Sequence, residues 1–222
     1  MASEVDICNI ALSHLGDTST VASLDPPEGS AQSEHCARFY PIARDSLLEM
    51  HTWSFATKRV QLAQLGSGWP EWDFAYAAPA DMVNIVAVLP PGATDDYSQV
   101  PIGAPAGTGG VYVPVPFACE TNEAGAYVIY TDQDDAVARY TALVTDTTRF
   151  SPLFVTTLSW HLASMLAGPI LKGDVGQAEA KRCALVAFGP DGQSGVFGQA
   201  VQSDAGQRRI IPQHNVAWIN GR

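Results

Sequence analysis

The side chains that could do chemistry are scattered along this sequence. The histidines are widely separated, at His14, His35, His51, His161 and His214. No two have the spacing at which one helix presents a pair of metal ligands. A single histidine on an apolar helix, such as His161, is typical of a hydrogen-bonded core residue. The sequence therefore predicts no metal site and no cofactor.

Three short segments approach known motifs, and each lacks a necessary residue. Gly103–Gly110 is glycine-rich but has no following Lys and Ser/Thr to hold phosphates and a metal. The segment 192–195 resembles a nucleophile elbow, but its second glycine comes one place too early. In a calcium loop starting at Asp132, Val137 would replace the turn glycine and Leu143 the bidentate glutamate. We expect no catalytic residue, with a weak cation contact at 132–135 as an alternative.

The net charge of -11 is unevenly distributed. No Lys or Arg lies between Arg59 and Arg139, although many acids do. Clustered Lys and Arg are needed to bind phosphates, so a nucleic-acid grip is excluded for this segment. A solvated face is the simple interpretation. The alternative is an acidic channel lining or wall made by Asp95, Asp96, Glu120, Glu123, Asp132, Asp134 and Asp135.

The composition is that of a globular protein, with 46% hydrophobic and 16% charged residues among 222. We expect no membrane span, because no apolar run approaches the ~20 residues needed. The first residues, MASEVDIC, lack the features of a secretory signal. The four cysteines have no paired spacing, which favours reduced thiols in a protein made in the cytoplasm.

The longest helical pattern runs from Ser30 to Thr57. Its apolar residues recur at helical spacing, and Ser30 and Ser33 are both plausible N-caps. Pro41 removes a backbone hydrogen bond, so we expect a kink or a late helix start near Tyr40. Trp53 follows directly and should enter a core.

Three further helices are expected. One covers Ser3–Leu15, capped by Ser3. A second begins at Ser151-Pro152 and is interrupted at Gly168-Pro169. The last runs from an Asp174 cap to Phe188 and turns four residues inward: Val175, Ala178, Leu185 and Phe188. The glycine-rich stretch 189–198 argues against its continuing to Asp204.

Between these helices the pattern becomes that of β-strands. A turn at Asp132–Asp135 is expected to join the last two strands as a hairpin. The segment Pro90–Gly110 is rich in Pro and Gly and predicts a loop. The expected strands are Lys58–Gln64, Met82–Leu89, Val111–Phe117, Ala126–Thr131 and Ala136–Val144.

The predicted fold class is α+β. Residues 1–57 and 147–206 form an antiparallel helical bundle, and 58–146 an inserted β-rich domain. Residues 207–222 form a C-terminal docking arm, because their apolar residues have nothing local to pack on. The arm would contact a partner or its own domain. Its candidate docking residues are Arg208, Arg209, Ile210, Ile211, Val216, Trp218 and Ile219.

A series of short segments occurs in a characteristic order: Ile7–Leu12 with Leu15-Gly16, Ala37–Leu48, Trp53–Arg59, Trp72, Ala75–Ala77, Pro79–Asp81, Arg139-Tyr140, Phe150–Phe154 and Leu162-Ala163. In this order they resemble the tail tubular protein A family, the head-to-tail adaptors or gatekeepers of short-tailed bacteriophages. The resemblance covers most of residues 5–172 and departs at 90–116 and 189–198.

The resemblance implies a structural virion protein without catalytic activity. Members of this family form a ring, typically dodecameric, between the portal protein and the tail nozzle protein, and tail fibres are a further partner. DNA would pass through the ring during ejection without specific binding. The resemblance places the protein in the neck of the virion and implies no membrane partner.

Three alternatives remain open at this stage. A head-completion or connector protein of a long-tailed phage would have a compact, all-helical fold. A small hydrolase would assemble a His and an acid from distant residues in a deep pocket. A ligand-binding module on the β-rich domain would be stabilised by a small molecule but not by a portal.

Overall fold

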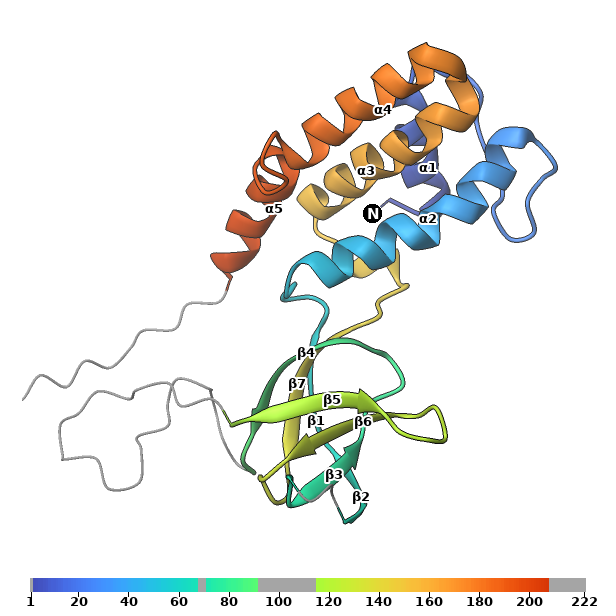
Figure 1. Ribbon diagram of the computed structural model, residues 1–222. Helices are drawn as coiled ribbons and strands as arrows, with labels where there is room; N and C mark the ends of the chain where they lie inside the picture. Colours follow the sequence, from blue (N-terminus) through green and yellow to red (C-terminus); the bar gives the residue numbers. More distant parts are fainter. Residues whose placement is uncertain (1, 68–70, 92–114, 208–222) are drawn as a thin grey trace, which may run out of the picture. The chain divides into compact units, whose positions relative to one another are not determined.

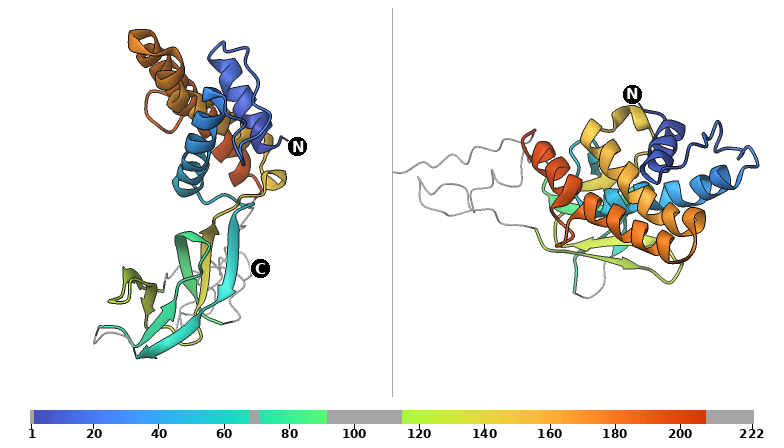
Figure 2. Two further views of the ribbon diagram at one scale, coloured as in Figure 1. Left: turned by 90° about the vertical axis from the view of Figure 1, so that its right-hand side faces the viewer. Right: turned by 90° about the horizontal axis from the view of Figure 1, so that it is seen from above.

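The computed structural model describes residues 2–67, 71–91 and 115–207, and the chain divides into two units (Figures 1 and 2). Met1–Ala56 and Leu143–Gln207 form the helical unit, and Thr57–Ala142 belong to the β unit. The fold is α+β, as predicted. The predicted boundaries at 57/58 and 146/147 compare with 56/57 and 142/143 in the structure.

Helices α1 (Glu4–His14) and α2 (Ala31–Met50) begin at the predicted caps. The Ser3 hydroxyl accepts a hydrogen bond from the Asp6 backbone N–H, and the Asp6 carboxylate accepts one from Ser3. Helix α2 continues through Pro41, so the predicted late start near Tyr40 is wrong. Pro41 costs one hydrogen bond, and the buried stripe on the opposite side of α2 offsets that cost.

Helix α3 (Pro152–Leu171) is central to the helical unit, since it contacts α1, α2, α4 and α5 (Figure 1). The predicted Ser151 cap is confirmed, because its hydroxyl accepts a hydrogen bond from Phe154 N–H. The predicted interruption at Gly168-Pro169 is wrong, since both lie inside the helix. Contrary to expectation, α3 is long and apolar enough to span a membrane, but it lies among other helices, as a core helix does.

Helix α4 (Gly173–Phe188) turns small residues toward α3. Its buried residues are Gly176, Cys183 and Ala187. A Cβ atom at Gly176 would lie 2.9 Å from the carbonyl oxygen of Ala167, so the backbones of α3 and α4 are in close contact. The prediction that four residues face inward is wrong for three of them. Val175 and Leu185 are 69% and 55% exposed, and Ala178 is also exposed.

Two predictions about the start of α4 and the region after it were also tested. Lys172, in positive φ, takes the N-cap position that was predicted for Asp174, which lies in the first turn. After α4, a separate helix α5 (Gly195–Ala205) follows the turn at 189–194, so the glycine-rich stretch does end α4.

Trp53 is fully buried, as predicted, and its ring makes edge-to-face contacts with the rings of Phe154 and Phe197.

The β unit contains two antiparallel sheets. The first has the strand order β1-β7-β4, and the second β2-β3-β6-β5. Side chains from both sheets, such as Tyr76, Ile129 and Tyr140, form one core. The strands are β1 (Thr57–Gln61), β2 (Ala63–Ser67), β3 (Phe74–Ala77), β4 (Met82–Leu89), β5 (Phe117–Thr121), β6 (Tyr127–Thr131) and β7 (Val137–Ala142).

The predicted hairpin between the last two strands is wrong. Strand β6 pairs with β3 and β5, whereas β7 pairs with β1 and β4. The segment 132–135 therefore carries the chain from one sheet to the other. The predicted strand 58–64 also divides at Leu62, whose N–H donates to Ala136 O at 2.9 Å. Buried Leu62 and Ala136 thus anchor both crossings in the shared core.

The other predicted strands have mixed outcomes. Met82–Leu89 is confirmed as β4. The expected strand 111–117 lies mostly outside the described residues, and β5 begins only at Phe117. The predicted loop 90–110 also lies mostly outside them.

The contact of α3 with α4 gives a test of the packing. Replacing Gly176 by Ala should lower the free energy of unfolding by about 1–3 kcal/mol, because the backbone of Ala167 cannot move aside cheaply. Gly168→Ala is the matched control, since its Cβ would meet no atom within 4 Å and Ala favours the helix. Denaturant unfolding measures both; equal effects of the two variants would contradict the assigned contact.

Candidate functional site

The described acidic residues of the predicted channel or wall are all exposed but do not form one patch. Glu120 and Glu123 lie on β5 and in the turn before β6, whereas Asp132, Asp134 and Asp135 follow β6. The length of β6, about 17 Å, separates the two groups. Asp95 and Asp96 lie outside the described residues.

The group that follows β6 is the denser one, and we call it the acidic end. It consists of Asp73, Asp132, Asp134 and Asp135. The backbone N–H of Asp73, before β3, donates to the Asp132 carboxylate at 3.1 Å, so two strand ends bring these acids together. Exposed carboxylates at this density repel phosphate at short range, although salt screens the effect beyond ~10 Å.

A cation of the β unit is paired within the unit. Lys58 Nζ lies 2.5 Å from Asp81 Oδ2, and the Tyr140 hydroxyl donates to the other oxygen of Asp81 at 2.9 Å. The hydrogen bond from Lys58 lowers the pKa of Asp81. This ammonium group is therefore engaged by a carboxylate of the same unit.

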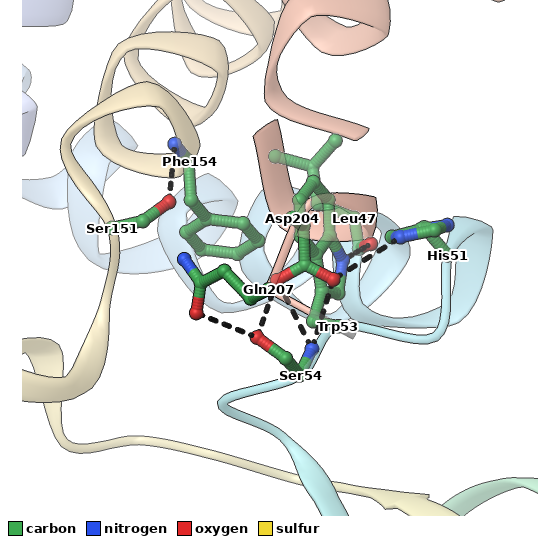
Figure 3. A network of polar contacts seen from close by, with 8 residues as sticks. All are labelled: Leu47, His51, Trp53, Ser54, Ser151, Phe154, Asp204 and Gln207. Carbon is green, nitrogen blue, oxygen red and sulfur yellow. Dashed lines mark hydrogen bonds and ion pairs between the residues drawn. The ribbon is translucent and has the colours of Figure 1, made fainter. Parts of the chain in front are cut away.

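The predicted docking residues from Arg208 to Ile219 lie outside the described residues, but the structure shows what precedes them. Helix α5 ends at Ala205, and the Asp204 carboxylate is bound by the turn that follows α2 (Figure 3). The Ser54 N–H donates to Asp204 at 3.0 and 3.1 Å, and the Ser54 hydroxyl donates at 2.6 Å. These bonds hold the end of α5, and so the start of the arm, at a defined place on the helical unit.

The same cluster contains Ser54, His51 and Asp204, which are the three residue types of a hydrolytic triad. In a hydrolytic triad the histidine lies between the serine and the aspartate, so that it can take the serine proton. Here the aspartate lies between the other two (Figure 3). His51 Nε2 is 3.4 Å from Asp204, within ion-pair distance but without a hydrogen-bond partner. The geometry is therefore that of a structural tie.

Sequence reasoning missed this tie. Ser54 and Asp204 are separated by 150 residues, and neither belongs to a motif. The local sequence gives no specific signal, because Asp204 follows Gln202 and Ser203 as one polar residue among several.

Other titratable side chains of the helical unit also serve packing. His161 Nε2 lies 3.0 Å from the Ser46 hydroxyl of α2, and its ring meets Phe188 of α4 edge-on. Burial lowers the pKa of His161 to about 4. His161 is thus a neutral packing residue, as predicted. Within the described residues, no group of His, Cys, Asp or Glu side chains could hold a metal ion.

A depression of about 560 Å³ lies where α4 turns into α5. Its carboxylate, Asp191, already accepts hydrogen bonds from Gln193 N–H, Ser194 N–H and the Ser194 hydroxyl, which lower its pKa to about 2. The lining contains neither a histidine nor a cation: Val186, Asp191, Gln193, Ser194, Gly195, Val196, Gly198, Gln199 and Gln202. It offers no general base at neutral pH.

Two helix faces carry large apolar side chains in solvent. The α4 outer face consists of Asp174, Val175, Ala178, Lys181, Arg182 and Leu185. The α2 outer face consists of Glu34, Arg38, Pro41, Ile42, Asp45 and Glu49, of which Ile42 is 53% exposed. Apolar groups ringed by charges are typical of association surfaces. Sequence periodicity missed the α4 face because it assigned Val175 and Leu185 to the core.

Comparison with known proteins adds no assignment. No known protein-family model matches this chain, and no curated protein is similar to it.

The tie at Asp204 gives a stability prediction. Asp204→Ala removes the acceptor for Ser54 and should lower the free energy of unfolding by about 1–3 kcal/mol. Amide hydrogen exchange in α5 should rise with it, since the helix end loses its anchor. Ser203→Ala, at the exposed neighbouring position, should change neither quantity. Unchanged exchange in α5 with Asp204→Ala would exclude the anchoring role.

His161 gives a prediction of pH dependence. Its pKa in the folded chain, about 4, is below the ordinary histidine value of 6.5, so its contribution to stability is complete above pH 6.5 and is lost as the pH falls toward 4. The loss is on the order of 3 kcal/mol. His161→Gln should flatten the pH profile of unfolding in this interval while retaining a partner for Ser46. If the slope is unchanged, His161 binds its proton over the same pH range in the folded and the unfolded chain, which would contradict the prediction.

Proposed function

We propose that this protein is a structural virion subunit: the head-to-tail adaptor between the portal and the tail nozzle of a short-tailed phage. Copies of the chain form a ring that contributes to the channel for DNA ejection, and the protein catalyses no reaction. The family resemblance in the sequence suggests this role. The observation that carries it is the α4 outer face.

Helix α4 packs on α3 through its small residues and leaves its large apolar residues free for association. Gly176, Cys183 and Ala187 fill the narrow space against α3, and Val175 and Leu185 are left in water. Fully burying a side chain of this size is worth about 1.5–3 kcal/mol each. A partner that covers this face would recover that free energy, so α4 is well suited to an assembled state.

The β unit has the electrostatics that a DNA passage requires. The acidic end is exposed, and the ammonium group of Lys58 is held by Asp81. A surface of this kind would not hold DNA phosphates as they pass. A phosphate-averse wall and association-prone helices are together what an adaptor needs.

The anchored end of α5 supports the docking arm. Asp204 fixes the point from which residues 207–222 continue. An arm that starts from a fixed point loses less conformational freedom when it docks on the portal or on a neighbouring copy.

The alternatives receive less support from the geometry. A long-tailed head-completion protein was expected to be all-helical, whereas this chain contains a β unit with two sheets. A hydrolase needs a base beside its nucleophile, and Ser54 donates to Asp204 instead. For a ligand-binding module on the β unit, thermal stabilisation by a small molecule but not by a portal would be the distinguishing result.

The function is tested by light scattering of the full chain, alone and mixed with the portal ring of the same phage. We expect monomers alone, since the net charge of -11 keeps copies apart, and a complex with many copies per portal ring in the mixture. Bovine serum albumin, which is also acidic, serves as the negative control. No complex with the portal, or turnover of a substrate by the pure chain, would contradict the proposal.

A further inference from the structure

We infer that the α4 outer face of one copy docks in parallel on the α2 outer face of a second copy. This inference rests on the proposed function and names the contact that would build the ring. Both faces carry exposed apolar side chains interspersed with charged ones.

The two helices lie on different sides of α3 and run in the same direction. Ser46 of α2 meets His161 of α3, and Trp53, just after α2, meets Phe154, so α2 runs antiparallel to α3. Gly176 of α4 meets Ala167, and Phe188 meets His161, so α4 also runs antiparallel to α3. Figures 1 and 2 show the same arrangement.

This geometry favours a head-to-tail contact. If neighbouring copies are related by a small rotation, equivalent helices in the two copies run in nearly the same direction. The α4 of one copy therefore meets the α2 of the next in parallel. Such a heterologous contact uses two different faces and repeats around a ring until it closes.

The charges on the two faces are complementary in this parallel register. Along α2, Arg38 is followed seven positions later by Asp45, and along α4, Asp174 is followed seven positions later by Lys181. Seven helical residues span about 10 Å on either helix. Arg38 then lies beside Asp174, and Asp45 beside Lys181. An antiparallel register would place like charges together.

The apolar residues fall between and beyond these pairs. Ile42 is four positions after Arg38, and Ala178 is four positions after Asp174, so the two meet at the centre. Leu185 of α4 reaches the level of Glu49 and of Met50, which is 45% exposed. The pairing thus matches both pairs of opposite charges and the central apolar pair over about two helical turns.

The charges of the first pair are available for a partner. Within the described residues, Arg38, Asp174 and Lys181 have no hydrogen bond or ion pair from their side chains. Asp45 is different, since Arg44 Nε donates to it at 2.7 Å, so it would be shared with Lys181. Exposed pairs are individually weak, which suits a contact that forms only when many copies are brought together.

The first test is cross-linking between copies of the full chain, in a Cys119→Ser background because the other described cysteines are buried. An Ile42→Cys chain is mixed with an Ala178→Cys chain, at a concentration well above that of the light-scattering test so that the weak contact forms transiently, and is treated with a short bismaleimide. We expect mixed dimers several-fold in excess of either self-linked dimer. In the control for random collision, a Tyr127→Cys chain, with its cysteine at the exposed start of β6, takes the place of the Ala178→Cys chain. A mixed yield equal to that control would overturn the inference.

The second test is charge reversal. Arg38→Asp or Asp174→Arg alone places like charges together and should lower the mixed cross-link several-fold. The double variant Arg38→Asp/Asp174→Arg restores opposite charges and should restore the yield. Both positions are exposed, and circular dichroism checks that the variants remain folded. Equal losses in the single and double variants would exclude this register.

Adding the portal ring separates the two proposals. Normal rings on the portal with both single-reversal variants would overturn the α4–α2 contact and leave the adaptor function standing. A selective cross-link without any assembly on the portal would overturn the adaptor function and leave the self-contact standing.

Discussion

The close contact between α3 and α4 is the constraint on which the rest of the helical unit depends. Because the Gly176 position leaves no room for a Cβ beside Ala167, α4 can approach α3 only with its small residues inward. This requirement fixes which face of α4 is turned toward α3. The large apolar residues Val175 and Leu185 then have no place in the core of a single copy. An intramolecular packing requirement thus creates the surface that we assign to association.

A second constraint fixes the other end of the unit. The Asp204 carboxylate binds the turn around Ser54, and Trp53 beside it is the largest fully buried side chain among the described residues. The end of α5 is therefore joined to the turn that places Trp53 in the core. Bonds of this kind explain how a short helix after a glycine-rich turn keeps a defined position. They also give the C-terminal arm a fixed origin.

Local signals predicted much of this fold. The caps at Ser3, Ser30 and Ser151 were correct because a side-chain cap acts within three residues. Strand β4 was correct because its β-branched run is unambiguous. The continuous α2 was not predicted, since the cost of Pro41 is local whereas the packing that offsets it comes from other helices.

Long-range relations were beyond a single sequence. The hairpin prediction failed because strand pairing is decided by which sheet buries each strand, and 132–135 joins two sheets. The inward face of α4 was misassigned because periodicity favours large apolar residues and gives no weight to a glycine that permits close approach. The tie between Ser54 and Asp204 carried no motif. The acids were found by composition, but their separation into two groups follows from the strand order.

The most direct measurement of the central claim is an electron cryo-microscopy reconstruction of the neck of the assembled particle. The account predicts a closed ring of identical copies beneath the portal, in which Val175 and Leu185 of each copy are covered by the α2 outer face of its neighbour. A neck without this chain, or a ring in which these α4 side chains face solvent, would contradict it.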